Sequence, residues 1–63
     1  MSLKVKEVIK MLEDAGWELV RTRGDHRMYN KKGARRPIVV PGKLSDTLPQ
    51  GTLSSILKEA GLK

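Results

Sequence analysis

The central stretch of the chain, residues 17–40, reads WELVRTRGDHRMYNKKGARRPIVV. Residues 17–22 alternate in character and are rich in amino acids that favour β-strands. Gly24-Asp25 is a turn signal, and Arg27-Met28-Tyr29 has the composition of a strand that returns after the turn. The stretch therefore begins with a predicted β-hairpin.

A third strand is expected after the hairpin. Residues 31–34, Lys-Lys-Gly-Ala, form a second predicted turn, and Pro37-Ile38-Val39-Val40 follows it as a short apolar run. Proline has no backbone N–H to donate, so Pro37 suits the start or the edge of a strand. The three strands predict an antiparallel sheet.

On either side of the strands, apolar residues recur with the period of an α-helix. They fall at i, i+3, i+4 and i+7 in two runs, Val5, Val8, Ile9 and Leu12 and then Leu53, Ile56, Leu57 and Ala60. Ser2 and Thr52 are the predicted N-caps, and Gly16 and Gly61 are the predicted stops. We therefore expect one α+β domain over residues 1–63, in the order α-β-β-β-α, with both helices on one face of the sheet. The other sheet face is then open to a ligand.

The inward-facing side chains of the second strand follow from its alternation. His26 and Met28 share one face, and Arg27 and Tyr29 share the other. If Tyr29 is the core residue, His26 lies on the open face or near its rim; if Met28 is, His26 points inward at the strand end. We favour Tyr29. Trp17, at a helix–strand junction, is expected in the core.

The charge of the chain is concentrated in its middle. Of 63 residues, 13 are Lys or Arg and 7 are Asp or Glu, a net charge of +6, and residues 21–43 alone carry +7. This distribution favours an anion-binding surface over a merely soluble protein, and the basic stretch is not an amphipathic helix of the kind that binds membranes. The chain has no cysteine, which excludes disulfides and cysteine-ligated zinc and favours a cytoplasmic location. It is also too short for a two-domain enzyme.

His26 is the only histidine and lies within this basic segment. Histidine can take and give a proton near neutral pH, and Arg23, Arg27 and Lys31 could neutralise a phosphodiester. RNA supplies its own nucleophile, the 2′-hydroxyl, so one base can start cleavage without a metal. No cluster of ligating residues is visible, and we expect no metal and no cofactor. A lone histidine at a hairpin is, by itself, more often structural or incidental.

The sequence resembles the HicA toxin family along most of its length. The resemblance rests on Gly24-Asp25-His26-Arg27-Met28-Tyr29 and on the segment Leu48-Pro49-Gln50-Gly51-Thr52-Leu53-Ser54-Ser55-Ile56-Leu57-Lys58-Glu59-Ala60-Gly61. It implies a fold like that of the double-stranded-RNA-binding domain and a metal-independent endoribonuclease that cleaves mRNA. It also implies a type II toxin–antitoxin system with a HicB antitoxin as partner.

Carried over by position, the active-site histidine of the family falls on His26, with Gly24 as the turn before it and Tyr29 at an aromatic position. Asp25 stands where the family usually has serine. Its carboxylate can either orient and charge the imidazole or repel the phosphate and slow cleavage. Together with the charge pattern, this predicts His26 as general acid or base and an RNA-binding set of Arg23, Gly24, Asp25, Arg27, Lys31 and Lys32.

Two alternatives remain open. The first is a noncatalytic RNA-binding module of the same fold; duplex binders usually carry lysines at the start of the second helix, whereas residues 51–55 contain no basic residue. The second is an interaction protein whose basic face meets an acidic partner. We expect mRNA and a HicB-type antitoxin as partners, and no direct binding to DNA or membranes.

Overall fold

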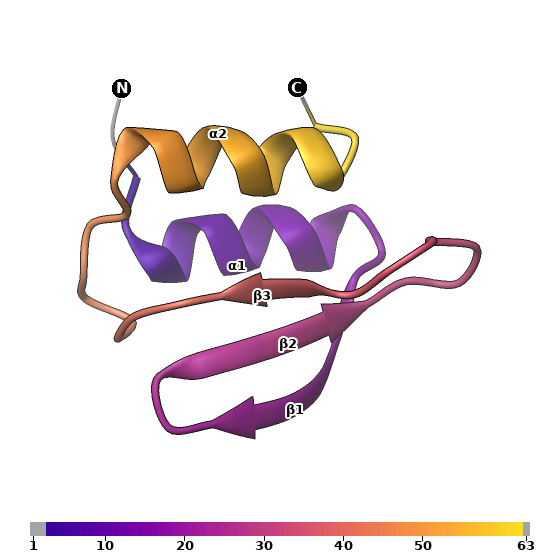
Figure 1. Ribbon diagram of the computed structural model, residues 1–63, viewed down its shortest axis with the longest axis horizontal. Coiled ribbons are helices and arrows are strands. Elements are labelled where there is room, and N and C mark those ends of the chain that lie inside the picture. Colours follow the sequence, from indigo (N-terminus) through magenta and orange to yellow (C-terminus); the bar gives the residue numbers. More distant parts are fainter. Residues whose placement is uncertain (1–2, 63) are drawn as a thin grey trace.

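The computed structural model describes residues 3–62 and contains two helices and three strands (Figure 1). In chain order they are α1 (Val5–Asp14), β1 (Glu18–Arg23), β2 (His26–Asn30), β3 (Ile38–Val40) and α2 (Gln50–Glu59). This order confirms the predicted α-β-β-β-α fold. Each predicted strand is present, and no strand end differs from the prediction by more than one residue.

The sheet is antiparallel with the order β1-β2-β3, so β1 and β3 are both edge strands. Tyr29 on β2 pairs with Leu19 on β1 and with Ile38 on β3. Residues paired directly across antiparallel strands share a face of the sheet. Tyr29 and Ile38 are buried, so this face is the one that the helices cover.

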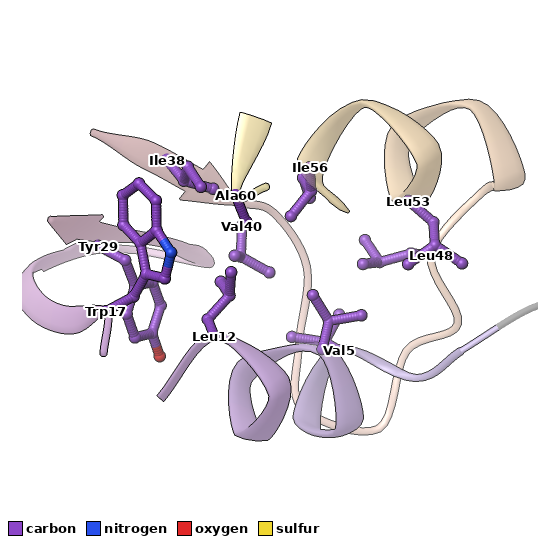
Figure 2. Close-up of a cluster of buried hydrophobic side chains, with 11 residues drawn as sticks. Val5, Leu12, Trp17, Tyr29, Ile38, Val40, Leu48, Leu53, Ile56 and Ala60 are labelled. Carbon is purple, nitrogen blue, oxygen red and sulfur yellow. The ribbon is translucent and has the colours of Figure 1, made fainter. Parts of the chain in front are cut away.

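The core lies between this sheet face and the two helices. Figure 2 shows Tyr29, Ile38 and Val40 from the sheet meeting the apolar stripes of α1 and α2. Tyr29 is 2% exposed and Trp17 is 4% exposed, which confirms the prediction that both are core residues. Burial raises the pKa of the Tyr29 hydroxyl, and the negative charge of Glu13 raises it further. The positive charge of Arg27 lowers this pKa, but the net shift is upward.

Both helices end in the same motif. The N–H of Gly16 bonds to the carbonyl of Glu13, and the N–H of Trp17 bonds to that of Leu12. This is a Schellman motif, which requires a left-handed residue, and Gly16 has φ +99°. Gly61 has φ +74° and ends α2 in the same way, so both predicted stops are confirmed.

The helix starts differ from the prediction. The N-cap of α2 is Pro49, whose carbonyl accepts the N–H of Leu53, so the prediction of Thr52 was wrong by three residues. Neither helix has a side-chain cap. Ser2 lies outside the described residues, and the N-cap of α1 is Lys4.

The first turn of α1 is satisfied by the loop that follows β3. The N–H of Val5 donates to the carbonyl of Asp46 (2.8 Å), and the N–H of Lys6 donates to that of Leu44 (3.2 Å). Backbone carbonyls thus replace the side-chain oxygen that the sequence pattern favours. This loop, residues 41–49, is therefore part of the support of α1.

Candidate active site

His26 begins β2 and lies on the sheet face that the helices leave open. It pairs with Arg23 on β1, and its side chain is exposed. Because Tyr29 faces the core, alternation places His26 and Met28 on the opposite face. Within residues 3–62 the His26 ring has no hydrogen-bond partner, so both ring nitrogens are accessible to a substrate.

A β-bulge in β1 brings two arginines to this face. Leu19 pairs with Tyr29, but Arg21 pairs with Met28, so Val20 is an extra residue in the strand. Without the bulge, Arg21 and Arg23 would follow Leu19 onto the helix side. With it, Arg21 and Arg23 stand beside Met28 and His26 on the open face.

These side chains surround a shallow hollow on the open face. Its volume is about 210 Å³, and it is lined by Arg21, Arg23, His26, Met28 and Val39. Val39 pairs with Met28, so the two apolar side chains are neighbours. The hollow thus combines an apolar floor with two guanidinium groups and one imidazole.

A second hollow extends from His26 to the start of α2. It measures about 540 Å³ and is lined by His26, Arg36, Pro37, Val39, Pro41, Gly51, Thr52, Ser55, Ile56 and Glu59. The two hollows share His26 and Val39. We refer to the two adjoining hollows together as the groove, which runs from β1 on the open face to the first turns of α2 and has His26 where the two hollows meet.

The predicted RNA-binding residues are only partly brought together. Arg23 lines the groove, and Gly24 and Asp25 form the exposed turn that leads into His26. Arg27 lies on the helix side of the sheet, where its Nη1 donates to the carbonyl of Gly42 at 3.0 Å. Its guanidinium is therefore engaged in the fold.

Lys31 and Lys32 follow the far end of β2. Lys31 comes five positions after His26, which is roughly 16 Å along extended backbone. In Figure 1 the β1–β2 turn and the start of α2 lie at one end of the molecule, and the loop after β2 lies at the other. Both lysines line two further hollows, one beside Trp17 and one beside Gly16. Neither includes His26, and the one beside Trp17 shares Arg36 and Glu59 with the groove.

Of the residues that line the groove, sequence reasoning predicted only Arg23 and His26, and it missed among others Arg21, Arg36, Met28 and Val39. Arg21 had a usable signal, since it lies two residues from Arg23 and strand side chains share a face at that spacing. Arg36 had none, because its position depends on how the loop before β3 meets α2.

The chemistry available in this groove is limited to side chains that hold anions and move protons. Residues 3–62 contain no group of three His, Cys, Asp or Glu residues that could hold a metal ion. None of the helices described is long and apolar enough to cross a membrane. One exposed imidazole flanked by arginines can bind a phosphodiester and exchange a proton with it.

The fold and this groove define a class of protein, a small basic α+β domain of the order α-β-β-β-α whose open sheet face carries two arginines and a histidine. A family model described as the HicA toxin of bacterial toxin–antitoxin systems matches residues 5–62. The chain belongs to this family. Membership gives it the role of toxin in such a system and implies a cognate HicB antitoxin. Among curated proteins, no match to the chain was found.

Proposed function

We propose that this toxin is an endoribonuclease that cleaves mRNA with His26 as its general acid or base. The observation that carries the proposal is the position of His26, exposed at the middle of the groove with Arg21 and Arg23 beside it. Family membership supports the same activity.

The reaction uses the 2′-hydroxyl of the RNA as nucleophile. His26 accepts the hydroxyl proton as the 2′-oxygen attacks the adjacent phosphorus, and the bond from phosphorus to the 5′-oxygen breaks. The leaving oxygen then takes a proton from the imidazolium or from water. The expected products are a 2′,3′-cyclic phosphate and a 5′-hydroxyl end.

Arg21 and Arg23 have an electrostatic part in this scheme. Negative charge grows on the phosphate oxygens as the 2′-oxygen adds, and guanidinium groups held beside them stabilise that charge. Both arginines are exposed, so water and salt weaken their effect. They contribute to binding and to the transition state without being proton carriers.

The second candidate, a noncatalytic duplex-binding module, is less well supported. Such domains hold phosphates with lysines at the start of the second helix. Here the first turns of α2 present Gly51, Thr52 and Ser55 to the groove. The cationic groups that line the groove lie elsewhere, on β1 and on the loop before β3.

The antitoxin fits the same scheme as an inhibitor. The groove is exposed, and its rim carries Arg21, Arg23 and Arg36. We expect the HicB-type antitoxin to cover His26 with an acidic surface and so exclude RNA. Charge complementarity of this kind speeds association and selects the partner.

The test compares purified wild type with His26→Ala on single-stranded RNA. Loss of a general acid or base lowers the rate by about 10²–10⁴-fold. Because His26 is exposed and has no hydrogen-bond partner among the described residues, its removal should leave the free energy of unfolding within about 0.5 kcal/mol of wild type. An oligonucleotide with 2′-deoxyribose at the cut site is the substrate control and should resist cleavage. Full activity of His26→Ala would overturn the proposal.

A further inference from the structure

We propose that the hollow between Arg21, Arg23, Met28 and Val39 is a pocket for one unpaired nucleobase of the RNA, next to the phosphate held at His26. This inference rests on the proposed function and adds a specificity subsite to it. It concerns the part of the groove on β1 and β2, away from α2.

The first observation is an apolar pair in the middle of the open sheet face. Val39 is the outward-facing residue of β3 and is 41% exposed, and its partner Met28 is half-buried. Neither side chain belongs to the core cluster on the other side of the sheet. The methionine thioether makes favourable contacts with aromatic rings, and a nucleobase offers such a ring.

The second observation is how the neighbouring side chains are arranged. The register places Arg21, Met28 and Val39 in one row across the three strands, and Arg23 and His26 in the next row. Same-face residues along a strand are about 7 Å apart, so a single nucleotide can span both rows. A phosphate over Arg23 and His26 leaves its base above Met28 and Val39.

The third observation is the size and charge of the hollow. A volume of about 210 Å³ takes one ring system and is too small for paired bases. Two guanidinium groups at its rim favour a ligand with phosphates, and guanidinium planes also stack on bases. In a duplex the base faces are stacked and inaccessible, so this pocket selects single-stranded RNA.

The test measures binding of a short RNA that cannot be cut because every 2′-hydroxyl, the nucleophile of the proposed reaction, is replaced by 2′-O-methyl. Abasic nucleotides are introduced one position at a time, and the dissociation constant is measured for wild type, Val39→Thr and Val20→Thr. Threonine keeps the shape and strand preference of valine and removes apolar surface. Val20 is the matched control, because it is 61% exposed on β1 and lies outside the hollow.

We expect one abasic position to weaken binding to wild type and to Val20→Thr by about five- to tenfold, the scale of losing one buried ring contact. In Val39→Thr the same abasic position should cost less than about twofold, and the intact RNA should bind about three- to fivefold more weakly.

An equal abasic penalty in all three proteins would overturn the pocket, as would the absence of any sensitive position in wild type. If Val39→Thr instead weakens only binding of the antitoxin, the hollow belongs to a protein interface and the proposal also fails. Because the assay measures binding and not cleavage, it tests the base pocket even if the wild type proves inactive. Such inactivity would contradict the proposed ribonuclease activity only.

Discussion

Arg23 and Arg27 lie four residues apart on one hairpin and have different tasks. Arg23 is exposed in the groove, whereas Arg27 is partly buried and donates to the carbonyl of Gly42. Gly42 belongs to the loop whose carbonyls accept the first N–H groups of α1. Alternation along the strand already puts Arg27 on the face of Tyr29, whereas the face of Arg23 depends on the bulge in β1, which the sequence does not show.

The two arginines should therefore respond differently to the same substitution. Arg27→Met keeps the apolar stem and removes the hydrogen bond, so we expect it to lower the free energy of unfolding by about 1–2 kcal/mol. Arg23→Met should change it by less than about 0.5 kcal/mol and should weaken RNA binding instead. Denaturant unfolding and RNA titration of both variants provide the check. Equal losses of stability would contradict the structural role of Arg27.

At the scale of elements, local pattern was sufficient wherever a single segment decides the structure. The apolar stripe of each helix and the glycine that ends it are both recognisable within a single segment of sequence. The structure confirms both helices and both terminal glycines. The bulge at Val20 and the start of α2 at Gln50 were missed. The bulge depends on the register with β2, and the chain just before α2 is held by a bond from the N–H of Leu48 to the distant carbonyl of Leu3.

Helix α2 offers a matched pair of glycines. Gly51 is in the first turn, and a Cβ there meets nothing within 4 Å; Gly61 is equally open but has φ +74°. Gly51→Ala should raise the free energy of unfolding by about 0.4–1 kcal/mol, because alanine loses less backbone entropy on folding. Gly61→Ala should lower it by about 1–2 kcal/mol, because alanine disfavours left-handed backbone. Thermal or urea unfolding tests the signs, and the same sign for both would contradict this account of the helix end.

At the scale of the whole molecule, the cationic side chains of residues 21–43 do not lie on one continuous surface. Arg21 and Arg23 line the groove beside His26, and Lys31 and Lys32 lie at the other end of the sheet. Arg36 lines both the groove and the hollow of the two lysines, and Arg27 faces the helices. The sequence correctly located the charge along the chain. How these charges are distributed over the surface depends on the strand pairing, which cannot be deduced from composition.

This division predicts the salt dependence of RNA binding. Each phosphate contact to single-stranded RNA contributes about −0.7 to the slope of log affinity against log salt. Contacts from the three groove arginines give a slope of about −2, whereas all eight cations of residues 21–43 would give about −6. Arg21→Ala should make the slope less steep by about 0.7, and Lys31→Ala, the matched control, should leave it unchanged. Titrations of a short single-stranded RNA at several salt concentrations measure both. A wild-type slope near −6, or equal effects of the two substitutions, would mean that RNA spans the full length of the sheet and not the groove alone.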